Sequence, residues 1–103
     1  MLAIAFLMLA LPSPALAADG AKIFTANCNA CHLGGKNIIM KDKSLSKADL
    51  AKYLKDFGDD PTGAIAYQIT NGKGAMPAFK GRISDADIAT VAAYVAEKAE
   101  AGW

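Results

Sequence analysis

Apolar residues recur at intervals of three and four along most of the chain, which is the spacing of one face of an α-helix. Four segments show this pattern, at about residues 20–31, 46–58, 60–71 and from 84 onward. No convincing alternation of apolar and polar residues indicates a strand. The pattern therefore predicts a small all-α fold of about four helices.

Residues that cap helices mark the expected boundaries. Ser46 and Ser84 are each followed three residues later by an aspartate, which resembles a capping box. Asp60 before Pro61 is typical of a first helical turn. The side chains expected to face the interior are Phe24, Asn27, Cys28, Cys31, Leu50, Tyr53, Leu54, Phe57, Ile65, Gln68, Ile69, Ile88, Val91, Ala92 and Val95.

The beginning of the chain differs from the rest. It carries no charge, is rich in leucine, contains two prolines and reaches an Ala-Leu-Ala run at 15–17. This composition is typical of a secretory leader with its cleavage site, so we expect residues 1–17 to be a cleaved signal peptide and 18–103 the mature domain. An uncleaved anchor is the alternative, although the stretch is short for a membrane span. Because no basic residue precedes the apolar run, it stays open whether the leader is complete at Met1.

The reactive side chains are concentrated in one pentapeptide, Cys28-Asn29-Ala30-Cys31-His32, which holds both cysteines and the only histidine of the sequence. Two thiols at this spacing can form thioethers with the vinyl groups of one haem, while the adjacent imidazole reaches the iron. The motif therefore predicts one covalently attached haem c, held by Cys28 and Cys31, with His32 as an axial ligand.

Other uses of a Cys-x-x-Cys pair fit less well. A thioredoxin-like dithiol would be expected beside a βαβ pattern, and none is visible. A zinc site needs a fourth ligand, yet the sequence holds no further cysteine or histidine. Haem attachment is the interpretation that uses all three residues.

The second axial ligand has two candidates. With one histidine, bis-histidine ligation is excluded, and methionine commonly lies opposite histidine in cytochromes c. Met40 follows His32 by only eight residues, so its backbone would have to turn around the haem edge at once. Met76 lies far along the chain, between the flexible Gly74 and the rigid Pro77. We therefore favour Met76 as the ligand and expect Met40 to pack against the haem or the core.

With these residues placed, the stretch 18–103 resembles the class I cytochromes c and, within them, the cytochrome c6 family of soluble photosynthetic electron carriers. The Cys-x-x-Cys-His motif is common to all c-type cytochromes. More specific are Tyr67-Gln68-Ile69-Thr70-Asn71-Gly72, Ala75-Met76-Pro77-Ala78-Phe79 and Gly102-Trp103. Lys80 departs from the family, which often has glycine there.

The resemblance implies an all-α class I cytochrome c fold with His and Met as axial ligands. It also implies a carrier, not an enzyme, that moves electrons from the cytochrome b6f complex, through its cytochrome f, to photosystem I. In the family a glutamine matching Gln68 tunes the haem and an arginine matching Arg82 lies near the haem propionates. The alternatives are a structural hydrogen bond for Gln68 and a solvated charge for Arg82.

Charge and compartment refine this expectation. The formal net charge of +1 argues against a nucleic-acid partner. Six lysines lie from Lys36 to Lys55. They form either a solvated helix face or a basic region that steers the encounter with a partner protein, and we expect Lys52 and Lys55 to be exposed.

Because haem attachment follows export, we expect the thylakoid lumen, with the periplasm as the alternative. We expect transient contact with membrane complexes and no integral membrane segment.

Two other function classes stay open. A respiratory class I cytochrome c would donate to an oxidase or reductase in place of photosystem I. A haem enzyme or gas sensor would need a displaceable sixth ligand, which two occupied axial positions disfavour.

Overall fold

The structure is a computed structural model that describes residues 14–103, so most of the expected leader lies outside the described residues. Within them it is helical, with two isolated β-bridges and no named strand. The elements are α2 (Pro14–Asn27), α3 (Asn29–His32), a short 3₁₀ turn η1 (Leu33–Gly35), α4 (Lys47–Tyr53), α5 (Pro61–Asn71) and α6 (Asp85–Ala101). The all-α prediction is confirmed.

The three predicted N-caps are confirmed. Ser46 is the N-cap of α4, and its hydroxyl accepts a hydrogen bond from the Asp49 amide at 3.1 Å. Asp60 caps α5 through the Gly63 amide, and Ser84 caps α6. Each side chain satisfies an amide that has no partner inside its own helix, so these short polar residues set where the helices begin.

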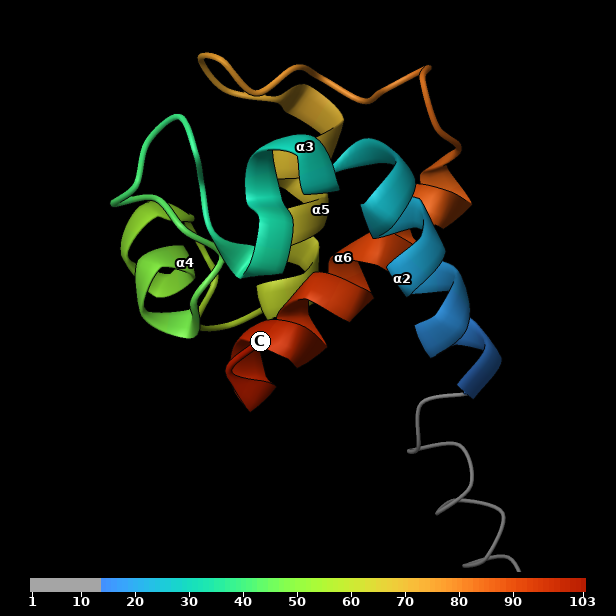
Figure 1. Ribbon diagram of the computed structural model, residues 1–103, viewed down its shortest axis with the longest axis horizontal. Helices are drawn as coiled ribbons and strands as arrows, with labels where there is room; N and C mark the ends of the chain where they lie inside the picture. The colour runs from blue at the N-terminus through green and yellow to red at the C-terminus, as the bar shows by residue number, and fades with distance from the viewer. Residues whose placement is uncertain (1–13) are drawn as a thin grey trace, which may run out of the picture.

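Helix α6 forms the centre of the fold and packs against both α2 and α5 (Figure 1). The helices α2 and α6 approach each other closely at Gly20, where an added Cβ would lie 2.6 Å from the Cβ of Tyr94. No helix in the described part of the chain is long and apolar enough to cross a membrane. The buried core consists of Phe24, Leu50, Phe57, Ala64, Ile65, Ile69, Ile88, Val91, Ala92, Val95 and Ala99.

The first predicted helix differs from the structure at both ends. It begins at Pro14, six residues before the expected Gly20, and it is interrupted at Cys28, so that Cys28 lies between α2 and α3 while Cys31 lies on α3. The expectation that Asn27 faces inward is wrong, because Asn27 is exposed and its amide donates to the Ile23 carbonyl on its own helix.

The second predicted helix is shorter than expected. It ends at Tyr53, because Leu54 takes an extended backbone with φ of −94° and ψ of 121°. Asp56 then has a positive φ of 65°, so the chain does not return to a helix before Gly58. Phe57 is still buried, but Tyr53 is 37 % exposed and does not belong to the core. Its hydroxyl donates to Asp42 instead.

Candidate functional site

Cys28 to His32 form one compact helical turn at the junction of α2 and α3. The Cys28 amide donates to the Phe24 carbonyl at 2.8 Å, and the His32 amide donates to the Cys28 carbonyl at 3.0 Å. Both thiols are free and half-buried. The two sulfurs and the imidazole are thus presented from a single turn of backbone, as attachment of one planar group requires.

The Cys28 thiol lies in an environment unlike that of a reactive thiol. Burial raises the pKa of the Cys28 thiol to about 11. A thiol that stays protonated at neutral pH is a poor nucleophile and a poor metal ligand. Among the described residues, moreover, no three histidine, cysteine or acidic side chains gather as a metal site would require.

His32 is oriented by a backbone group that sequence analysis missed. Its Nδ1 lies 2.9 Å from the carbonyl oxygen of Lys36. A carbonyl oxygen can only accept, so Nδ1 carries the proton and Nε2 keeps its lone pair free for a metal. No side-chain pattern could have revealed Lys36, because only its backbone takes part.

Met76 lies on a loop that is anchored to the end of α5. Lys73 and Met76 exchange two backbone hydrogen bonds of 3.0 Å, which close a tight turn. Beyond it, the amides of Phe79 and Lys80 donate to the Ile69 and Thr70 carbonyls of α5. These are carbonyls that a helix end leaves without partners, so the methionine loop caps α5 while α5 holds the loop in place.

Gly72 at the start of this loop is a second residue that sequence analysis did not single out for function. Its φ and ψ are 67° and 178°, a region open essentially to glycine alone. An added Cβ would lie 2.5–2.7 Å from backbone atoms of Met76, Pro77 and Ala78. The close approach of this backbone, rather than a simple helix stop, requires glycine here.

The two methionine candidates have different surroundings. Met76 is half-buried and packs against the same core cluster as Cys28. The segment 72–83 that carries it crosses the end of the molecule at which α3 lies in the view of Figure 1 (gold to orange). Met40 is 46 % exposed, so it does not pack in the protein core.

The structure places the two residues whose roles came from the resemblance as follows. Gln68 is half-buried on α5, and no hydrogen bond of its amide group is found within residues 14–103. A structural hydrogen bond to the backbone, the alternative for Gln68, is therefore not found there. Arg82 is exposed, with its guanidinium 5.5 Å from the centre of the Phe79 ring.

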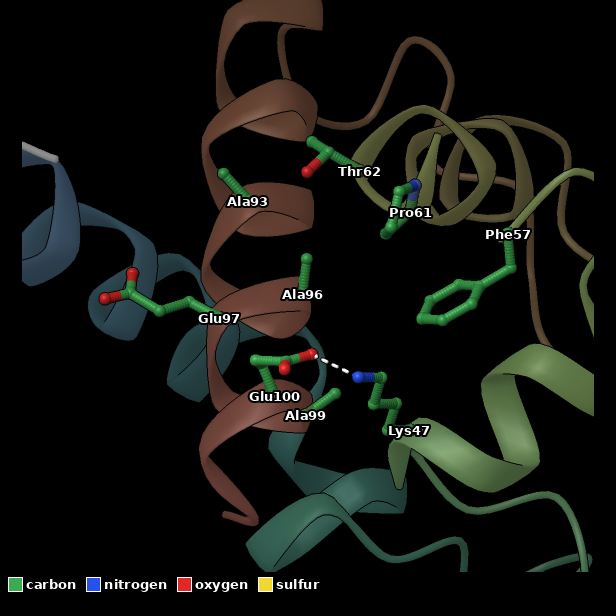
Figure 2. Close-up of a pocket in the computed structure, with 9 residues that line it drawn as sticks. All are labelled: Lys47, Phe57, Pro61, Thr62, Ala93, Ala96, Glu97, Ala99 and Glu100. Carbon is green, nitrogen blue, oxygen red and sulfur yellow. Dashed lines mark ion pairs between the residues drawn. The ribbon is translucent and has the colours of Figure 1, made fainter. Parts of the chain in front are cut away.

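A cavity of about 490 Å³ lies away from these side chains, between α4, α5 and α6 (Figure 2). It is lined by Phe57, by alanines of α6 and, at its rim, by the ion pair Lys47–Glu100 of 2.8 Å. None of the cysteines, His32 or Met76 lines it, so it is not the place where their shared ligand would bind.

The residues at the Cys28–His32 turn fit a covalently bound haem. The imidazole presents a free Nε2, two unpaired thiols flank it on one turn, and a half-buried sulfur is available from the Met76 loop. Large apolar side chains suited to the edge of a porphyrin follow directly in sequence: Leu33, Ile38 and Ile39 are all more than half exposed.

Comparison with known proteins agrees with this fit. Residues 15–95 match the family model described as cytochrome C oxidase, cbb3-type, subunit III. Cytochrome c6 of Limnospira maxima is 62 % identical over 86 residues, which cover 84 % of this chain and 97 % of that protein. Cytochrome c6 of Nostoc sp. is 56 % identical over 106 residues, covering 100 % of this chain and 92 % of the relative.

A solved structure extends the likeness to three dimensions. The crystal structure of cytochrome c6 from the diatom Phaeodactylum tricornutum has 54 % sequence identity and a TM-score of 0.79, covering 84 % of this chain and 98 % of that one. Fold and site thus define a class I cytochrome c with one covalently bound haem c, which acts in electron transport. Within that class, the chain belongs to the cytochrome c6 family.

Proposed function

We propose that this electron carrier accepts electrons from the cytochrome b6f complex, through cytochrome f, and delivers them to photosystem I. The observation that supports the haem site of this carrier is the orientation of His32, whose Nδ1 is tied to Lys36 and whose Nε2 is free. The similarity to cytochromes c6 over nearly the whole of several relatives supports the choice of partners.

The chain contributes the groups that hold and tune the cofactor. Cys28 and Cys31 would form the two thioether bonds, and His32 Nε2 with the Met76 sulfur would supply the axial ligands. Haem iron, when bound, supplies reversible one-electron chemistry. Because both axial positions would be filled, the site would bind no substrate, and the residues would act by holding the ligands in the same place in both oxidation states.

Two further side chains are proposed to tune the site. Gln68 would place an amide dipole near the haem, and its half-buried position without a found partner is compatible with that role. Arg82 would lie near the haem propionates, where a guanidinium can pair with carboxylates. Its exposed side chain lies over the Phe79 ring, and none of its side-chain donors has a hydrogen-bond partner within residues 14–103.

The compartment follows from the chemistry of attachment. We propose the thylakoid lumen, with removal of residues 1–17 before folding, and the periplasm as the alternative. Helix α2 would then begin at about Ala18, which leaves Phe24 and the approach to Cys28 unchanged. The first residues of the purified protein would read Ala18-Asp19-Gly20, and its mass would equal residues 18–103 plus one haem. An intact leader would favour a membrane anchor.

Flash kinetics test the partner assignment. The reduced holoprotein should re-reduce photo-oxidised photosystem I rapidly and in proportion to its concentration. If it fails there but is oxidised quickly by a terminal oxidase, the respiratory alternative is correct. Carbon monoxide binding distinguishes either kind of electron carrier from a haem enzyme or gas sensor. In a carrier the filled sixth position should prevent carbon monoxide from binding to the reduced protein at neutral pH.

A further inference from the structure

The segment 35–45 carries the Lys36 carbonyl to which His32 donates, and its two ends meet at a narrow neck. The Leu45 amide donates to the Gly35 carbonyl at 2.7 Å, which joins the two ends of the segment 35–45. Gly35 directly precedes Lys36, whose carbonyl accepts from His32 Nδ1. The position of that carbonyl therefore depends on whether the neck stays closed.

Trp103, which is distant in the sequence, contacts both ends of the segment at this neck. Its indole Nε1–H donates to the Leu45 carbonyl at 2.7 Å, across 58 residues. The indole ring lies against buried Gly35, where φ is 80° and an added Cβ would overlap the ring. The same ring packs on Phe24, with 5.3 Å between ring centres. Trp103 thus joins both sides of the neck to the helix that leads to Cys28.

Three hydrogen bonds, linked by short pieces of backbone, connect Trp103 to the imidazole. Trp103 donates to the Leu45 carbonyl, the Leu45 amide donates to Gly35, and the next carbonyl along the chain accepts from His32, at 2.7, 2.7 and 2.9 Å. Each bond uses a different peptide group, so the coupling is geometric: loss of the Trp103 bond releases the Leu45 end of the segment, on which the position of Gly35 and of the Lys36 carbonyl depends. The Ile38 amide, which donates to the Cys31 carbonyl, ties the loop to the attachment turn as well.

We propose that Trp103 is a positioning residue for the proximal ligand: by closing the 35–45 neck it holds the Lys36 carbonyl on His32 Nδ1 and thereby sets the basicity of the imidazole. An imidazole that donates a strong hydrogen bond from Nδ1 is a more basic ligand, which favours the ferric state. A weaker bond should raise the reduction potential. The inference rests on the proposed ligation of iron by His32.

The test uses Trp103→Phe in the holoprotein, which removes the Nε1–H donor and the second ring of the indole but keeps an aromatic ring at this position. Ile88→Ala is the control, because Ile88 is 3 % exposed and lies near the start of α6, whereas Trp103 follows the other end of this helix, about four helical turns away. Denaturant conditions are chosen so that the two variants have equal global stability. NMR then follows exchange of the His32 Nδ1 proton with solvent, and redox titration gives the potential.

Trp103→Phe should exchange this proton about fivefold faster than Ile88→Ala, the effect of one lost hydrogen bond, and should have a higher potential. Equal exchange in both variants would overturn the proposal, since Trp103 would then act only through overall stability. A lower potential would also overturn it, because that change indicates entry of water. Absence of a haem-shifted Nδ1 proton in the unsubstituted protein would instead refute the ligation by His32, on which the proposal rests.

Discussion

If Met76 binds the iron as proposed, replacing Gly72 by alanine should release it while leaving the rest of the fold intact. Gly72 has φ of 67° and ψ of 178°, and a non-glycine residue in this region costs up to ~3 kcal/mol. The new Cβ would also meet backbone atoms of the Met76–Ala78 segment at 2.5–2.7 Å, and backbone cannot rotate aside as a side chain can. The loop is therefore expected to shift away from α5.

Gly74→Ala is the matched control, since it lies two residues further along the same loop. It also has positive φ, 58°, but an added Cβ there would meet no atom within 4 Å. Only the left-handed conformation is penalised, by roughly 1 kcal/mol. The two variants therefore share the chemical change and differ in the backbone contact.

The assay is the ferric sulfur-to-iron absorption band, followed as pH or temperature displaces the methionine. With ~3 kcal/mol lost, the equilibrium for opening the loop in Gly72→Ala should rise on the order of 100-fold, against about fivefold for Gly74→Ala. Equal effects in the two variants would refute the argument that the close backbone approach at Gly72 positions Met76.

Three further results are expected. Gln68→Val should lower the reduction potential while both axial ligands stay bound, and an unchanged redox titration would leave Gln68 a structural role only. Lys52 and Lys55 are exposed, as predicted. Changing both to Gln should slow association with the partner at low salt and flatten the salt dependence of the association rate in flash kinetics. An unchanged salt dependence would place the docking charges elsewhere. A hydrogen bond from Ser44 holds the pKa of Asp49 below its usual value. The charged carboxylate therefore stabilises the fold at pH values above its unfolded pKa of about 3.9. Asp49→Asn should lower the thermal stability at neutral pH, and this loss should shrink as the pH falls below that value. A loss that does not change with pH would contradict this assignment.

What could be predicted from sequence is what local chemistry determines. The caps at Ser46, Asp60 and Ser84 act on amides two or three residues away, so the start of three helices was predicted correctly. The core face of α6 followed from its period. The Cys28–His32 turn is likewise local, and its spacing predicted the covalent haem that the family carries.

What sequence could not reveal depends on backbone groups or distant contacts. The Lys36 carbonyl that orients His32 has no side-chain signature, and the contact of Trp103 with Gly35 joins segments with no common pattern. The end of the second helix was misjudged because Leu54 adopts an extended backbone while its side chain keeps the apolar spacing of a helix. In each case a local pattern was overridden by tertiary packing or by backbone geometry.

The most direct test of the account is the identity of the distal ligand, compared in Met76→Ala and Met40→Leu. Met76 is half-buried on an anchored loop, whereas Met40 is 46 % exposed. Met76→Ala should abolish the ferric sulfur-to-iron band, give high-spin or water-ligated iron and lower the reduction potential strongly. Met40→Leu should leave the spectrum nearly unchanged. If Met40→Leu abolished the band and Met76→Ala preserved it, the assignment of the site would be contradicted.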